Sequence, residues 1–303
     1  MKLTMKFNVK VKLLTMFLVA LPAITACDDD EDQQPPSGLN ICLTWKDSQN
    51  SNDSIKDICV WLHKEDSMFV DEYHFASQQE LEQKRHKLAT GTYLVLATTN
   101  LLPPFTNEFT QAATFTDGSR HFISLKEANA SPEQAYYSVA KVQVVENEPQ
   151  TVKTPMRKIL AELTLTIKGV PEGTIQKCKI ENAAAGIYPA LKGPNGEYGI
   201  PSDVAVPVTM PQAVPTKGML QTNDFRLMPS VRGATHTEIA MQLIYQNTKK
   251  NDFTIYGPPM EIGGNYTIAL DFADMAPIMY LNSVKIGEWK EEWTISGEVL
   301  NPD

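Results

Sequence analysis

The residues with the clearest chemical potential lie near the start of the chain, where an apolar segment ends in a cysteine. The segment opens with four lysines, Lys2, Lys6, Lys10 and Lys12. The apolar run of residues 13–24 follows, and then come Thr25, Ala26 and Cys27. The run is shorter than the roughly twenty residues that span a bilayer. A basic start and small residues at the end are typical of a cleavable secretory signal, because the peptidase reads an extended backbone in a narrow slot. We therefore predict a signal peptide over residues 1–26.

The cleavage site Ile24-Thr25-Ala26-Cys27 resembles the lipobox of bacterial lipoproteins. The resemblance implies that the Cys27 sulfur receives a diacylglycerol, that the signal is cut before it, and that the new amine is acylated. Each buried methylene contributes about 0.8 kcal/mol, so several acyl chains hold a protein on a membrane almost permanently. The alternatives are an ordinary signal peptide with an incidental cysteine, or a retained N-terminal anchor.

Five acidic residues follow the cysteine at once: Asp28, Asp29, Asp30, Glu31 and Asp32. They repel anionic headgroups, and together with "QQPPSG" they predict a solvated, lipidated tether over residues 27–38. Acidic residues directly after the lipid cysteine also resemble the surface-export signal of Bacteroidetes lipoproteins. We therefore expect lipid anchoring at the outer face of the outer membrane. A periplasmic location and a plain soluble linker are the alternatives.

The rest of the chain shows no pattern typical of catalysis or metal binding. The five histidines are scattered: His63, His74, His86, His121 and His236. None belongs to a Glu-x-x-His or His-x-x-x-His pair, and there is no Gly-x-Ser-x-Gly nucleophile elbow or phosphate-binding glycine loop. We predict no catalytic, cofactor-binding or metal-binding residues and no enzyme. His63 and His74 flank a predicted hairpin, and we expect both at its rim.

Three cysteines remain beyond the signal, namely Cys42, Cys59 and Cys178. An exported chain could oxidise Cys42 and Cys59, which fall in neighbouring predicted strands. Three is an odd number, however, and none has the spacing of metal ligands. We favour buried free thiols over a disulfide.

The charge balance excludes one class of partner. The whole chain has a net charge of −9, and without the four signal lysines 23 basic and 36 acidic residues give −13. Such a chain is not expected to bind nucleic acid or an anionic membrane surface through charge.

Beyond residue 38 the sequence alternates in the manner of β-strands. The predicted strands cover residues 40–45, 57–63, 92–99, 137–146, 159–169, 175–183, 238–246, 265–272 and 293–300. Helix is scarce: residues 77–89 open with a Ser77/Glu80 capping box and could form two or three turns, and residues 131–137 offer a short helix start. Residues 201–218 are too rich in proline for a central strand.

Two parts of the chain resemble each other. "TGTYLVLATTN" (90–100) and "GGNYTIALDFA" (263–273) both place Gly-x-Tyr before an alternating apolar strand. The roughly 265 residues after the tether are more than one small core usually needs. We therefore predict two related β-sandwich domains, over residues 39–150 and 151–303.

Two tryptophans in "EWKEEW", Trp289 and Trp293, are four residues apart and would therefore lie on one face of a strand. The functional interpretation is that they stack against a sugar. The structural interpretation is that they pack between the sheets or at the edge of a sandwich, and we favour it for these two residues and for Trp45 and Trp61.

The order of lipobox, acidic tether, "LTW", "GTYLVLATTN", the strand at 157–169 and the terminal "IGEWKEEWTISGEV" is similar to Bacteroidetes fimbrillin-type lipoproteins. That group includes the fimbrillin-associated anchor proteins. The resemblance implies two transthyretin-like (Ig-like) β-sandwich domains and a role in building or anchoring surface fimbriae. Polymerising subunits of the family are trimmed by an arginine-specific protease, for which Arg85 and Arg120 are the candidates here. An anchor keeps its lipid and is not trimmed.

We therefore expect a lipid-anchored surface protein that serves as a fimbrial component, anchor or assembly accessory in cell adhesion. A sheet edge would receive a partner's strand by β-augmentation, which draws affinity from main-chain hydrogen bonds. The main alternative is a glycan-binding accessory lipoprotein of an outer-membrane polysaccharide uptake system. A lipid-anchored hydrolase is the third.

Overall fold

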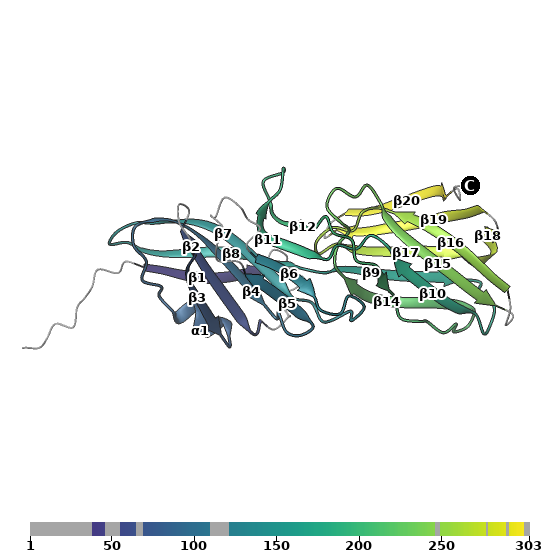
Figure 1. The fold of residues 1–303 in the computed structure, drawn as a ribbon, viewed down its shortest axis with the longest axis horizontal. Helices are drawn as coiled ribbons and strands as arrows, with labels where there is room; N and C mark the ends of the chain where they lie inside the picture. The colour runs from purple at the N-terminus through teal and green to yellow at the C-terminus, as the bar shows by residue number, and fades with distance from the viewer. Residues whose placement is uncertain are drawn as a thin grey trace, which may run out of the picture. The chain divides into compact units, whose positions relative to one another are not determined.

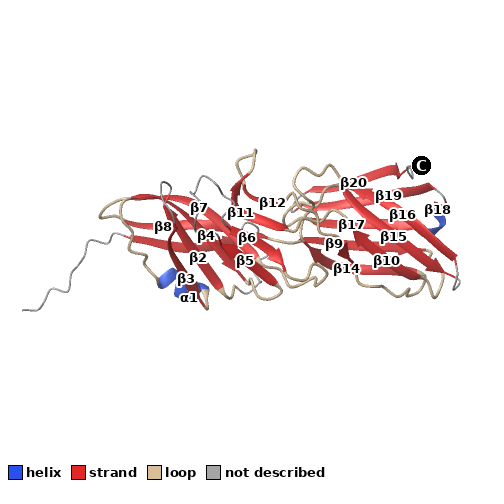
Figure 2. Ribbon diagram, viewed as in Figure 1, coloured by secondary structure: helices blue, strands red, loops and turns tan. Residues whose placement is uncertain are grey.

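The computed structural model describes residues 38–45, 55–64, 69–109, 121–245, 249–276, 278–288 and 291–299, and from residue 274 onward it describes the backbone alone. These residues form β-strands almost throughout, with one short helix and one 3-10 turn, η3 (Phe272–Asp274) (Figures 1 and 2). The all-β prediction is confirmed.

The first sandwich consists of two sheets. Sheet 1 has the strand order β1-β8-β7-β4-β2-β3, and sheet 2 has the order β12-β11-β6-β5. Its strands are β1 (Gly38–Trp45), β2 (Ile58–Lys64), β3 (Phe69–Phe75), β4 (Gly91–Thr99), β5 (Phe105–Phe109), β6 (His121–Leu125), β7 (Tyr136–Val144), β8 (Pro149–Lys158), β11 (Gly186–Lys192) and β12 (Tyr198–Pro201).

The second sandwich also has two sheets. Sheet 3 has the order β13-β10-β15-β16, and sheet 4 has the order β14-β9-β17-β19-β18, with β20 also paired to β19. Its strands are β9 (Ala161–Lys168), β10 (Ile175–Ile180), β13 (Val208–Thr209), β14 (Met219–Leu227), β15 (Thr237–Tyr245), β16 (Lys249–Gly257), β17 (Asn265–Asp271), β18 (Met275–Ala276), β19 (Ile278–Glu288) and β20 (Glu291–Val299).

Alternating residues form the predicted strands because successive side chains point to opposite faces of a sheet. In β9, every second residue from Ala161 to Ile167 is buried and the residues between them are half-buried. In β2 six successive residues are buried, because both faces of this central strand are covered. All nine predicted strands are present.

The only α-helix among the described residues, α1 (Gln78–Gln83), is shorter than predicted. The Ser77 side chain accepts a hydrogen bond from the Glu80 amide, so the N-cap is as expected. Residues 131–135 form no helix, and β7 begins at Tyr136. The proline-rich stretch contributes only the two-residue β13.

Each sandwich has its own hydrophobic core. In the second, one cluster joins Leu165 and Ile268 of sheet 4 to Met241 and Ile255 of sheet 3. In the first, residues of sheet 2 such as Ile123 pack against the β7 side of sheet 1. The opposite face of sheet 1 buries a further cluster that includes strands β1, β2, β4 and β8, and Leu81 of α1 packs into it.

The β11–β12 hairpin connects the two sandwiches. The chain leaves sheet 3 after β10, adds β11 to β6 of the first sandwich, and returns to sheet 3 at β13. Tyr137 donates a hydrogen bond to the Tyr198 carbonyl (2.9 Å), and Arg157 pairs with Glu197 at 3.0 Å. Gly199 has a φ of +100°, and a Cβ there would overlap the Tyr137 hydroxyl. The position therefore requires glycine.

The predicted division between residues 150 and 151 falls inside β8, whose residues 149–156 pair with β1 and whose last two residues pair with the start of β7. The extent of each domain stays a prediction. The two sandwiches nevertheless share a pattern of pairing. Strands β2-β4-β7 and β10-β15-β16 are both antiparallel ladders, and the first strand of each sandwich (β1 or β9) pairs in parallel with a later one.

The two Gly-x-Tyr sequences lead into strands that occupy different positions in their sheets, since β4 lies between β2 and β7 whereas β17 lies between β9 and β19. The two tyrosines nevertheless make the same kind of hydrogen bond. The Tyr93 hydroxyl donates to the Ala89 carbonyl (2.8 Å), and the Tyr266 hydroxyl donates to the Pro259 carbonyl (3.2 Å). Each buried tyrosine thus fixes the loop before its strand.

Candidate functional site

Three side chains with metal-binding or nucleophilic atoms meet on the β2–β3 hairpin. Cys59 of β2 lies directly opposite His74 of β3, and Trp61 lies opposite Glu72. Side chains two residues apart on a strand share a face, so Cys59, Glu72 and His74 all point to the same side. Their ligand atoms lie within 4.8 Å of one another.

The contacts in this cluster converge on a small volume. His74 Nε2 lies 2.9 Å from Glu72 Oε1, Cys59 Sγ lies 3.3 Å from the same oxygen, and Sγ lies 3.6 Å from Nε2. A nucleophile–histidine–acid relay needs the thiol and the acid on different ring nitrogens. Here both approach Nε2. The geometry is therefore that of ligands around one point and not that of a catalytic triad.

Cys59 is a protonated thiol in this environment. It is 9% exposed, and burial raises the pKa of its thiol well above the ordinary value, with the hydrogen bond to Glu72 and the Glu72 charge adding to the effect. A nucleophilic cysteine needs the opposite shift. Cys59 alone is thus an unreactive group beside a carboxylate and an imidazole.

This cluster was not predicted from the sequence, because its order is Glu72-Tyr73-His74 and not one of the helical spacings typical of metal ligands. Glu-x-His on a strand places both side chains on one face. That signal was present, whereas the approach of Cys59 depends on the β2–β3 register.

A second group of histidines is buried between sheets 1 and 2. His63 Nε2 lies 3.0 Å from His121 Nε2, and both residues are at most 1% exposed. The Phe109 ring stacks on His121 with the centroids 4.5 Å apart. The prediction of a rim position is wrong for His63, because the central strand β2 is covered on both faces. It is confirmed for His74, whose side chain is 69% exposed.

The three cysteines are free thiols. Cys42 and Cys59 are close in sequence, but β8, β7 and β4 separate β1 from β2 in sheet 1. At about 4.8 Å per strand this distance excludes a disulfide. Burial raises the pKa of Cys178 to about 12. The expectation of free thiols is confirmed.

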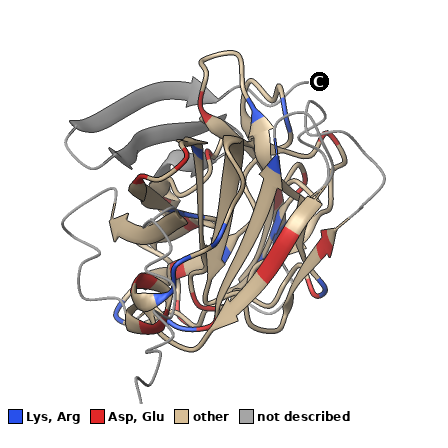
Figure 3. Cartoon of the chain, turned by 90° about the vertical axis from the view of Figure 1, so that its left-hand side faces the viewer, with Lys and Arg blue, Asp and Glu red and all other residues tan. Residues whose placement is uncertain are grey.

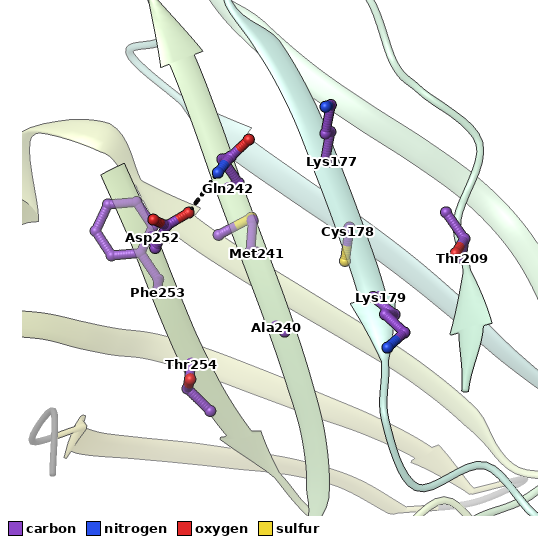
Figure 4. A pocket seen from close by; sticks show the side chains of 10 residues that line it. All are labelled: Lys177, Cys178, Lys179, Thr209, Ala240, Met241, Gln242, Asp252, Phe253 and Thr254. Atoms are coloured by element: carbon purple, nitrogen blue, oxygen red, sulfur yellow. Dashed lines mark hydrogen bonds between the residues drawn. The ribbon is translucent and has the colours of Figure 1, made fainter. Parts of the chain in front are cut away.

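A shallow hollow of about 580 Å³ lies on sheet 3 (Figure 4). Its ionisable lining residues are Lys177, Lys179, Cys178 and Asp252. Asp252 accepts a hydrogen bond of 2.7 Å from Gln242, and Cys178 is 2% exposed with its sulfur in the core. The hollow therefore presents an open surface of mixed polar and apolar groups, without a pair of converging acid and base groups.

The predicted tryptophan sites are only partly described. Trp61 is 4% exposed, and Trp45 packs edge-on against Tyr136 with ring centroids 5.0 Å apart, so both have structural positions. Trp289 lies outside the described residues, and Trp293 is described only as the backbone partner of Ile286. Sugar stacking by Trp289 and Trp293 stays a prediction.

The predicted lipidation site and export signal, Cys27 and residues 28–32, also lie outside the described residues. Among those that are described, no helix has the length and apolar composition that crossing a bilayer requires. In Figure 3, positions of Lys or Arg and of Asp or Glu are interspersed along the ribbon.

The predicted mode of partner binding requires an open sheet edge. The outer edge of β1 is covered, because Leu39 and His86 exchange two backbone hydrogen bonds (2.9 and 3.0 Å) and Gln78 donates to the Leu43 carbonyl. Among the described strands, β3 forms the other edge of sheet 1, and β16 and the two-residue β13 form the edges of sheet 3. Charged residues occupy β3, as is common on protected edges, whereas residues 253–257 of β16 carry no charge.

Comparison with known families decides the class of the chain. The model of the fimbrillin-A associated anchor proteins Mfa1 and Mfa2 matches residues 29–294. The chain belongs to this family. The predicted resemblance is confirmed. The anchor family is one of fimbrial and adhesion proteins and not of enzymes, which supports a fimbrial role in cell adhesion at the cell surface.

Solved structures share the fold of this anchor-family chain. The fimbrial anchor protein Mfa2 from Porphyromonas gingivalis is 11% identical with a TM-score of 0.52, over 88% of this chain and 100% of that one. A candidate adhesin from Bacteroides thetaiotaomicron is 14% identical with a TM-score of 0.50, over 88% and 99%. A candidate polysaccharide-binding protein from the same species is 9% identical with a TM-score of 0.56, over 86% and 98%. Identities this low establish the fold alone. No curated protein matches the sequence.

Proposed function

We propose that this chain is a lipid-anchored, non-enzymatic surface protein that holds fimbriae at the outer membrane. The family match carries the proposal, since it extends from residue 29, two residues after Cys27, to residue 294. Acyl chains on Cys27 fix one end in the membrane, and the acidic tether keeps the folded part away from the headgroups.

The first strand supports an anchor over a trimmed subunit. Leu39, Ile41 and Leu43 of β1 are at most 2% exposed, and burying each such side chain contributes roughly 2 kcal/mol. Arg85 is exposed, but it follows α1 and precedes β4. A cut after Arg85 would separate β1, β2, β3 and α1 from the rest of the chain. Because β2 is an interior strand of sheet 1 that is buried on both faces, their loss would open the core. Arg120 lies outside the described residues.

We place partner binding at the outer edge of β16. Residues 253–257 pair with β15 on one side and offer an uncharged edge on the other. A fimbrial subunit's extended segment could add there as a further antiparallel or parallel strand. The hollow on sheet 3 lies beside this edge and would contact the added segment (Figure 4).

The anchoring role is tested by following where fimbriae accumulate. A strain that carries Cys27→Ser in the full chain is compared with the wild type for fimbriae on cells and in the medium. We expect the variant to release most fimbriae into the medium. An unchanged distribution, with the variant shown to lack lipid, would refute the anchoring role.

The binding edge is tested separately with a photo-crosslinking residue at Thr254, compared with one at the exposed Lys141 of the first sandwich. Capture of a fimbrial subunit from Thr254 alone supports the β16 edge. Equal capture from both positions, or capture from neither, contradicts it.

A further inference from the structure

We propose that Cys59, Glu72 and His74 form a binding site for a divalent transition-metal ion, with Zn²⁺ as the best-suited ion. The site is independent of the fimbrial role and is built from two neighbouring strands. A thiolate, an imidazole and a carboxylate form a ligand set that Zn²⁺ takes in proteins, whereas Ca²⁺ and Mg²⁺ prefer oxygen ligands alone.

The distances in the cluster are those that a tetrahedral ion requires. With Zn–S of about 2.3 Å and Zn–N and Zn–O of about 2.0 Å, the sulfur of a tetrahedral site lies about 3.5 Å from the nitrogen and from the oxygen, which lie about 3.3 Å apart. The corresponding distances here are 3.6, 3.3 and 2.9 Å. Side-chain shifts of a few tenths of an ångström would therefore admit the ion.

The hydrogen bonds that now hold the cluster point to the place of the ion. The Cys59 thiol donates to Glu72 Oε1, which also lies within hydrogen-bond distance of His74 Nε2. On binding, the thiol proton is released to solvent and the sulfur donates an electron pair to the ion. An imidazole proton on Nε2 moves to Nδ1, which leaves Nε2 as the donor to the metal. No oxidant or reductant is needed.

The surroundings hold two of the ligands and leave space for further ones. Cys59 packs with Trp61 and Leu96, and β2 is fixed between β3 and β4. His74 is exposed on the edge strand, so water or a ligand from another molecule can take the fourth position. Opposite Cys59 on β4, the buried Thr98 hydroxyl has no hydrogen-bond partner among the described residues. It lies on the same face and could bond to a metal-bound water.

Local charge also favours a cation. The carboxylate of Asp57 makes the electrostatic potential at Cys59 more negative. A further carboxylate, that of Asp71, lies beside Glu72 and accepts a hydrogen bond from the Glu72 backbone amide (2.9 Å). The excess of acidic residues over the whole chain acts in the same direction.

The test uses the full-length protein, stripped with a chelator and titrated with Co²⁺ as a spectroscopic probe and then with Zn²⁺. We expect one equivalent to bind, with a thiolate-to-cobalt charge-transfer band and the visible bands of a tetrahedral ion, both removed by Zn²⁺. His74→Gln changes an exposed side chain and leaves the fold intact. It should weaken binding by about 100-fold or more, because even residues that only support metal ligands contribute 10- to 100-fold.

Matched variants separate this site from others. Cys59→Ser should abolish the charge-transfer band, whereas Cys42→Ser and His236→Gln should keep both band and affinity. If the wild type shows no such band, or if His74→Gln and Cys59→Ser bind as the wild type does, the site is refuted.

Discussion

Replacing His86 by phenylalanine should change how stability depends on pH. His86 is 1% exposed and lies between β1 and β3, where its ring meets Tyr73 edge-on with centroids 4.4 Å apart. Burial, together with the smaller effect of the Lys84 charge, lowers the pKa of His86 to about 4, against the opposing effect of Asp71. Both ring nitrogens lack hydrogen-bond partners among the described residues. The folded protein therefore holds a neutral imidazole that the unfolded chain can protonate.

The sign and size of the effect follow from this difference. The unfolded histidine has a pKa of 6.5. As pH falls below that value, the unfolded state binds a proton that the folded state does not, so stability falls until pH 4 and then levels off. The loss from this residue is about 2 kcal/mol at pH 5 and about 3 kcal/mol at its limit. At pH 7 a phenylalanine should be neutral or stabilising, since it leaves no buried polar atom without a partner.

The assay is urea unfolding of the wild type and His86→Phe at pH 7 and pH 5, with the exposed His236→Gln as control. The wild type and the control should lose about 2 kcal/mol more than His86→Phe between the two pH values. Taking the difference between variants cancels the other titrating groups. If His86→Phe loses as much stability as the wild type, His86 is not held neutral by burial and the reasoning fails.

Three further predictions concern other parts of the chain. Gly199→Ala should destabilise the protein by several kcal/mol in urea unfolding, because its φ is +100° and a Cβ would overlap Tyr137. The control Gly196→Ala also lies at positive φ but has only a flexible lysine side chain nearby, so it should destabilise the protein by about 1 kcal/mol. Equal losses of stability in the two variants would contradict the steric explanation. In the folded protein a thiol reagent should label the half-buried Cys42 well before Cys59 and Cys178, as read by mass spectrometry, and equal rates would mean that burial does not control access. Neutralising residues 28–32 with Asn and Gln should move the protein from the cell surface to the periplasmic leaflet, and identical digestion of both forms when intact cells are shaved with protease would count against an export signal.

Much of the fold could be predicted because it rests on local patterns. Alternation in β9 and β15, and apolar runs in β2 and β4, identify core strands without knowledge of their partners. Strand β8 is not among the predicted strands, and it contains Pro149 and Pro155, which donate no backbone hydrogen bond. It is a strand because its parallel partner β1 supplies the hydrogen bonds and because Val152 and Met156 enter the core. The same limit applies to the β11–β12 hairpin, which lies in the first sandwich only because Gly186 permits close approach to Ile123.

The candidate sites also differ in how far the sequence predicts them. The lipobox is a contiguous motif and can be recognised directly in the sequence, whereas the cluster at Cys59 forms only through the register of two strands. His63 illustrates the difficulty best. A histidine near the end of a predicted strand is more often exposed, and only the pairing with His121, 58 residues later, places it in the core.

The β11–β12 hairpin has a mechanical consequence for an anchoring protein. The backbone crosses between the sandwiches at residues 159–160, 181–185 and 202–207, so three covalent stretches connect them in parallel. Tension applied between the tether and a fimbria bound to the second sandwich is shared among these three, and one stretched linker cannot carry it alone. Pulling the hairpin out of the first sandwich would also require breaking the β6–β11 pairing. A protein built in this way should transmit force between its two sandwiches without extending at the segments that connect them.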